Sequence, residues 1–140
     1  MLQQEKIVKF MLLYPEYNVS IETNGTILPN EFLLRKAKFN CSPKLLNSGN
    51  KGLEKFLINK EVLSAIALTT DPCFKFVVNK IKDFKEIEEK FGSIVPKEQI
   101  YIMPEGVLIE ENIKVYEKIM GKIIGGGYST TPRIQNICFN

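Results

Sequence analysis

The 140-residue chain contains no histidine and only three cysteines. Histidine is the commonest general base and the commonest metal ligand, so its absence excludes Ser-His-Asp, Cys-His and His-based zinc chemistry for this chain alone. Cys41, Cys73 and Cys138 are odd in number and far apart in sequence. This spacing matches no metal site and argues against a disulfide framework. We expect buried thiols in a reduced, cytoplasmic protein.

Long apolar runs and a strong charge bias are also absent. No apolar stretch approaches the ~18 residues of a transmembrane helix, and polar residues interrupt the N-terminal apolar positions, so neither a membrane span nor a signal peptide is expected. The net charge is +3, and the lysines are spread along the chain. This distribution argues against direct nucleic-acid binding. The length predicts a single domain over residues 1–140, and the hydrophobic content of 44% is sufficient for a core.

The apolar pattern predicts helices that alternate with strands. Spacings of three and four residues favour helices over residues 2–14, 53–68 with a break near Asn59, 83–91 and 109–124. Alternating or β-rich runs favour strands over residues 17–21, 34–41, 74–78, 99–103 and 131–139. Gly125-Gly126-Gly127 is expected to end the last helix instead of cradling a phosphate. The alternation predicts an α/β fold of parallel β/α units.

Three short polar strings follow expected strands: Glu22-Thr23-Asn24-Gly25-Thr26, Ser42-Pro43-Lys44 and Met103-Pro104-Glu105-Gly106. In one parallel sheet, all three would lie at the carboxyl-end edge, where open α/β sheets and barrels bind ligands. The first string can hydrogen-bond ligand hydroxyls or an amine, the second can pair with a carboxylate, and the third can lie against a ring. Each string also fits a plain alternative: a strand-ending turn, an exposed loop lysine, and a strand that leads through proline into a helix.

In this order, the strings resemble one family, the 7-carboxy-7-deazaguanine synthases, which are radical S-adenosylmethionine enzymes. The stretches that carry the resemblance cover the chain from about residue 17 to its end, and they are VSIETNGT, NCSPKLLNSGN, FKFVV, IYIMPEG and GYSTTPRIQN. The resemblance implies the C-terminal half of a partial (β/α)6 barrel, with a [4Fe-4S] cluster, S-adenosylmethionine and Mg²⁺ as the family's cofactors. The implied reaction contracts the ring of a pterin-like substrate, a carboxy-tetrahydropterin, to 7-carboxy-7-deazaguanine for queuosine and related pathways.

The resemblance also implies roles for residues at the strand ends. The expected contacts to S-adenosylmethionine are Glu22 and Asn24 with its ribose or amino group, Ser42 and Lys44 with its methionyl part, and Met103, Pro104 and Glu105 with its adenine. Arg133 and Gln135 match an Arg-x-His string that lies close to the substrate in the family, with glutamine at the histidine position.

The family's CxxxCxxC cluster motif and its GGEP string are absent from the chain. Because three thiolates must converge on one cluster, we expect no cleavage of S-adenosylmethionine by this chain alone. One hypothesis is the binding half of a deazaguanine synthase whose cluster half is elsewhere. The alternatives are a non-catalytic ligand-binding or interaction remnant, and part of another radical enzyme such as an activase. A half-barrel would expose its first strand, near residues 17–22, to a complementary N-terminal half chain or a second copy in a homodimer.

Overall fold

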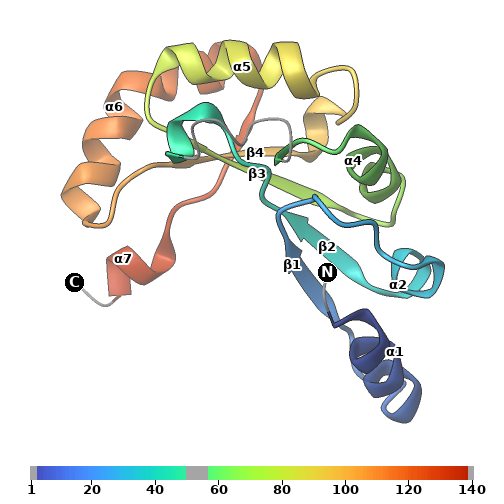
Figure 1. The fold of residues 1–140 in the computed structure, drawn as a ribbon. Helices are drawn as coiled ribbons and strands as arrows, with labels where there is room; N and C mark the ends of the chain where they lie inside the picture. Colours follow the sequence, from blue (N-terminus) through green and yellow to red (C-terminus); the bar gives the residue numbers. More distant parts are fainter. Residues whose placement is uncertain (1–2, 50–56, 139–140) are drawn as a thin grey trace.

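The computed structural model describes residues 3–49 and 57–138 (Figure 1). Helices and strands alternate along the chain. In order, they are α1 (Gln4–Leu13), β1 (Ser20–Thr23), α2 (Glu31–Lys36), β2 (Lys38–Cys41), α4 (Lys60–Ala67), β3 (Cys73–Val78), α5 (Ile81–Phe91), β4 (Ile100–Pro104), α6 (Ile109–Gly126), β5 (Ser129–Thr130) and α7 (Ile134–Cys138). Single turns of 3₁₀ helix follow β2 at Leu46–Ser48 and precede β4 at Lys97–Gln99.

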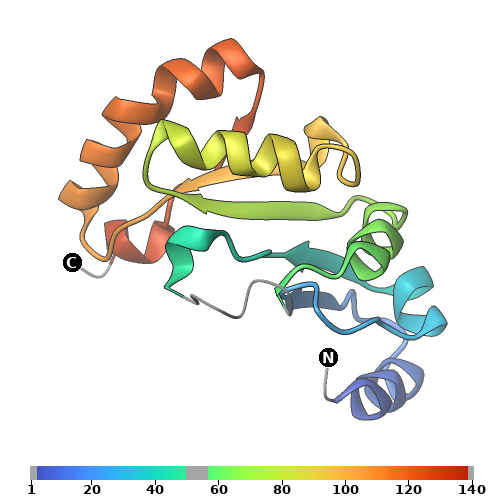
Figure 2. The same ribbon diagram turned by 45° about the horizontal axis from the view of Figure 1, so that its top comes forward.

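The five strands form one parallel sheet in chain order, β1-β2-β3-β4-β5. The prediction of parallel β/α units is therefore confirmed. Connections between parallel neighbours are right-handed, so a sheet that adds each new strand on the same side places its connecting helices on one face. Both views show α5 and α6 on the same side of the sheet (Figure 1, Figure 2).

The two faces of the sheet differ in burial. In β3, Phe74, Phe76 and Val78 point toward the helices and are fully buried. Successive side chains point to opposite faces, and the alternate residues of the strands are less buried. We call this second surface the open face. It carries Ser20, Glu22, Asn40, Cys73, Lys75, Val77, Tyr101 and Met103.

The core lies between the sheet and its helices. Phe76 packs on Phe91 of α5 with ring centroids 4.9 Å apart, and both rings are fully buried. The apolar residues of α5 recur every three or four positions, which turns one side of the helix toward the sheet. Burial of each such side chain stabilises the fold by roughly 1.5–3 kcal/mol. The predicted helices over residues 2–14, 83–91 and 109–124 are confirmed with small shifts of their ends.

Three strand predictions need correction. The strand predicted over residues 17–21 begins too early, because β1 occupies Ser20–Thr23. The strand predicted over residues 34–41 is wrong in its first half, because α2 occupies Glu31–Lys36 and β2 begins only at Lys38. Asn30 caps α2, since its side-chain oxygen accepts a hydrogen bond from the backbone N–H of Leu33 at 2.9 Å. An asparagine followed by an acidic first turn is the signal that could have predicted this helix.

The strand predicted over residues 131–139 is also wrong. The fifth strand is only Ser129–Thr130, and Ile134–Cys138 is helical. Pro132 has no backbone N–H to donate to the ladder, so the apolar residues beyond it do not extend the strand.

Two breaks were predicted correctly. In the helix predicted over residues 53–68, the break near Asn59 is confirmed, because Asn59 caps α4. The part of this predicted helix before residue 57 lies outside the described residues. The glycine run ends α6, and Gly127 caps it with a φ of +66°. In the described part of the chain, no helix is both long and apolar enough to cross a membrane.

Candidate functional site

The carboxyl ends of β1, β2 and β4 carry the three polar strings, on one edge of the parallel sheet. At the end of β1, the side-chain oxygen of Asn24 accepts hydrogen bonds from the Thr26 backbone N–H at 3.3 Å and the Thr26 hydroxyl at 2.8 Å. Gly25 follows with a φ of +76°. The carboxamide of Asn24 is therefore engaged in shaping its own turn, although it remains exposed.

Glu22 lies on the open face, where its carboxylate is 3.7 Å from the Lys75 ammonium of β3. This ion pair reaches across β2, because Glu22 is in register with Asn40 and Asn40 with Cys73. The Glu22 side chain is 71% exposed, so the pair contributes at most about 1 kcal/mol. It does place two opposite charges on the open face, within reach of one ligand. Sequence reasoning missed Lys75. The one feature that could have indicated it is a charged residue within the otherwise apolar run of β3.

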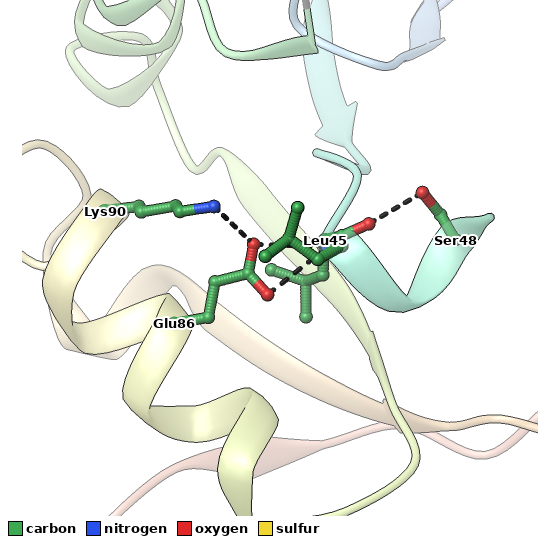
Figure 3. A network of polar contacts seen from close by, with 5 residues as sticks. Leu45, Ser48, Glu86 and Lys90 are labelled. Atoms are coloured by element: carbon green, nitrogen blue, oxygen red, sulfur yellow. Dashed lines mark hydrogen bonds and ion pairs between the residues drawn. The ribbon is translucent and has the colours of Figure 1, made fainter. Parts of the chain in front are cut away.

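The loop after β2 is fastened to β3 and α5. The Ser42 hydroxyl donates to the Lys75 carbonyl at 3.2 Å. Glu86 of α5 accepts the Leu46 backbone N–H at 3.1 and 3.3 Å, and it pairs with Lys90 at 2.7 Å (Figure 3). Lys44 is exposed and lines a small hollow with Glu86 and Lys90. The loop is thus held in place while its lysine side chain is free to reach a ligand.

The third string divides between the two faces of the sheet. Met103 is half-buried on the open face, and Pro104 is buried on the helix side. Glu105 follows the strand, where its backbone N–H donates to the Val78 carbonyl at 2.9 Å. Its carbonyl accepts the Asn112 side-chain amide at 3.0 Å. Glu105 and Gly106 of this string line a large hollow of the described structure, whereas Met103 and Pro104 do not.

Arg133 lines that same hollow, beyond the end of β5. The backbone of Gln135 belongs to α7, but its side chain lies outside the described part of the structure. Glu105 and Arg133 are therefore brought together. The other predicted residues with described side chains are not in this hollow: Glu22 lines a separate one beside α1, and Lys44 lies at α5.

Two buried asparagines, which sequence reasoning missed, organise this end of the sheet. Asn112 of α6 and Asn136 of α7 are only 6% and 8% exposed. The amide of Asn136 donates to the Gly106 carbonyl at 3.1 Å and to the side-chain oxygen of Asn112 at 2.9 Å. Together with the bond from Asn112 to Glu105, these contacts fix the loop after β4 against two helices. A buried polar network of this kind holds one geometry, because breaking it leaves buried groups unsatisfied.

The cysteines do not fit an iron–sulfur cluster. Cys41 is fully buried, and burial together with the nearby Cys73 thiol raises its pKa to about 12. Cys73 is half-buried in the next strand, and burial raises its pKa as well. Cys138 is exposed in α7. In residues 3–49 and 57–138, no three side chains of His, Cys, Asp or Glu are grouped to hold a metal ion.

Comparison with known proteins finds one curated relative. The chain is 30% identical over 121 residues to the 7-carboxy-7-deazaguanine synthase of Pyrobaculum aerophilum, and the match covers 84% of this chain and 50% of that protein. The chain thus spans about half the length of the curated relative it matches. No family model matches the chain, and no solved structure matches it. The match supports a distant relationship between the two proteins.

Proposed function

We propose that this chain provides the S-adenosylmethionine- and substrate-binding part of a radical S-adenosylmethionine enzyme similar to 7-carboxy-7-deazaguanine synthase, and that it is inactive alone. The observation that carries the proposal is the distant relationship to that synthase. The fold supports it, because strings matching the family lie at the carboxyl ends of parallel strands, at the sheet edge where α/β proteins bind ligands. The substrate would be a pterin-like molecule.

The consecutive order of the parallel strands supports a half-barrel. A doubly wound sheet reverses its strand order at a switch point and covers both faces with helices. Here the order does not reverse, and the open face carries polar groups such as Glu22, Asn40 and Lys75. We propose that this face is the interior of a partial (β/α)6 barrel, where Glu22 and Lys75 would meet S-adenosylmethionine.

The chain's own residues would bind and orient, and the radical chemistry would depend on a cluster that they do not hold. Lys44 would pair with the methionyl carboxylate, while Ser42 and Glu86 keep its loop in place. Met103 would offer an apolar surface to the adenine. Arg133 would contact the substrate from beyond β5. The cluster ligands would come from a partner, because the described cysteines lie in three separate elements.

Titration of the purified chain with S-adenosylmethionine by calorimetry tests this proposal. We expect binding, and we expect Lys44→Ala to weaken it by about 1–3 kcal/mol, a rise in Kd of roughly 5- to 150-fold, as for the loss of a charged hydrogen bond. Lys36→Ala is the matched control, because this exposed lysine lies just before β2 at the opposite end of the same strand. An unchanged Kd in Lys44→Ala would refute the role of that lysine. Absence of any binding would favour the non-catalytic alternative.

The partner is proposed to pair with the exposed edge of β1. Among the described residues this strand is paired with β2 on one side only. Phe10 of α1 and Tyr14 and Tyr17 after it are exposed nearby, with ring centroids 5.1 to 6.3 Å apart. An unpaired edge next to exposed aromatics invites association. In sedimentation velocity, we expect the chain to form a homodimer or to bind a complementary half chain. A stable monomer that binds neither, and that does not bind a hydrophobic dye, would contradict this.

A further inference from the structure

A hollow of about 570 Å³ lies where β3, β4 and β5 end. Its walls are Asn79 after β3, the Glu105–Val107 loop after β4, the first turns of α6, and Arg133 after β5. The hollow is large enough for a small ligand, and its position at the carboxyl ends of parallel strands is typical of binding sites.

Three positive side chains line this hollow. Lys114 and Lys118 lie one turn apart on α6, and Arg133 reaches the hollow from the loop after β5. In the part of the chain that the structure describes, none of the three forms an ion pair. Three cations that share a cavity repel one another unless an anion is bound between them.

Two carboxylates also line the hollow, and their situations differ. Glu111 is already engaged, because it accepts the backbone N–H groups of Val107 at 2.8 Å and Leu108 at 3.2 Å. These bonds, assisted by the charge of Lys114, lower the pKa of Glu111. The Glu105 carboxylate makes no hydrogen bond with any described residue. The hollow therefore presents three cations and two carboxylates, of which only Glu105 is unengaged, so positive charge exceeds negative charge by one.

Arg133 supplies a second, independent indication of a ligand. Its Nε is fully buried and has no hydrogen-bond partner among the described residues. A buried charged donor without a partner is unfavourable, and a ligand oxygen would satisfy it. The bonds of Asn136 to Gly106 and Asn112 fix the start of α7, so the backbone that carries Arg133 is held in place.

We propose that this hollow is an anion-binding site, in which Arg133, Lys114 and Lys118 receive a phosphate or carboxylate group. Charge-assisted bonds from arginine and lysine suit both groups, and the planar guanidinium is the donor best matched to an oxyanion. Glu105 then stands beside the anion and accepts a hydrogen bond from a hydroxyl or amino group of the same ligand. The inference does not require S-adenosylmethionine binding, because the binding of simple anions to the chain can be measured without it.

Calorimetric titrations of the full chain at low ionic strength, with inorganic pyrophosphate and with malonate, test the proposal. We expect Arg133→Gln and the double variant Lys114→Gln/Lys118→Gln each to weaken binding by about tenfold. The lysines are exposed, so their double variant does not depend on tolerance of a change at Arg133. Lys85→Gln is the control, because it removes the same charge from an exposed position on α5 that does not line the hollow.

Glu105→Gln gives an outcome of opposite sign. Neither pyrophosphate nor malonate needs the Glu105 carboxylate as a hydrogen-bond acceptor. Removal of this negative charge should therefore tighten their binding by roughly threefold. Stronger binding of pyrophosphate than of malonate would identify a phosphate-bearing ligand, and the reverse a carboxylate. No binding of either anion would overturn the proposal. So would an equal loss in Lys85→Gln and the hollow variants, because that would indicate attraction by net charge only.

Discussion

Replacement of Gly25 by alanine is expected to lower the free energy of unfolding by about 2–4 kcal/mol. Gly25 is buried and has a φ of +76°, which L side chains rarely adopt. A Cβ at this position would lie 2.6 Å from Cδ2 of Leu63 and 2.8 Å from Sγ of Cys41. Because Leu63 and Cys41 are 1% and 0% exposed, neither side chain can move out into solvent.

Gly127→Ala separates the two causes of this loss. Gly127 caps α6 with a φ of +66°, and no described atom lies within 4 Å of a Cβ built there. Its replacement should cost about 1 kcal/mol from backbone strain alone. Urea denaturation followed by circular dichroism measures both variants. Equal losses at Gly25 and Gly127 would show that the close approach to Leu63 and Cys41 does not contribute.

This result bears on the motif that contains Gly25. The sequence reasoning weighed a ligand site against a strand-ending turn, and the contacts of Gly25 and Asn24 show that the turn has a structural role of its own. A structural role does not exclude ligand binding, since Glu22 of the same string faces the open side of the sheet. Calorimetry of Gly25→Ala with S-adenosylmethionine, under conditions where the variant is folded, would report the second role separately.

The sequence predicted those parts of the fold that depend on local pattern. Phe84, Ile87 and Phe91 recur with helical spacing, and α5 lies where they predict it. The parallel sheet followed from alternation of helices and strands. The pattern failed where local chemistry competes with hydrophobicity, as in α2, where the cap at Asn30 outweighs the strand-like apolar run.

The site was predictable only in outline, for a physical reason. Parallel topology alone implies that the carboxyl ends of the strands share one edge of the sheet. The strings were therefore placed at the correct edge. Which side chains meet depends on register between strands that are far apart in sequence. The pairing of Glu22 with Lys75 spans three strands, and no periodicity within one strand specifies it. Asn112 was missed because its partners lie outside its own helix.

Asp83→Ala is expected to destabilise the fold by about 2–4 kcal/mol, because it leaves several donors at a buried site without an acceptor. Asp83 is only 4% exposed. One of its carboxylate oxygens accepts the backbone N–H groups of Asn79 at 2.8 Å and Lys80 at 3.2 Å, and the side-chain amide of Asn47 at 3.0 Å. The residue therefore caps α5 and also joins the loop after β2 to the turn after β3.

Glu111→Ala is the matched control, because Glu111 has the same capping role in α6 but is exposed. Water can replace an exposed carboxylate as acceptor, so this variant should lose much less stability than Asp83→Ala. Urea denaturation of both variants gives the comparison, and similar losses would contradict the dependence on burial. Asn47→Ala provides a further test, since it leaves Asp83 in place and removes the bonds from the loop after β2 to Asp83 and to the Val77 carbonyl. If these bonds position Lys44, Asn47→Ala should weaken S-adenosylmethionine binding although Asn47 itself contacts no ligand in the proposed site.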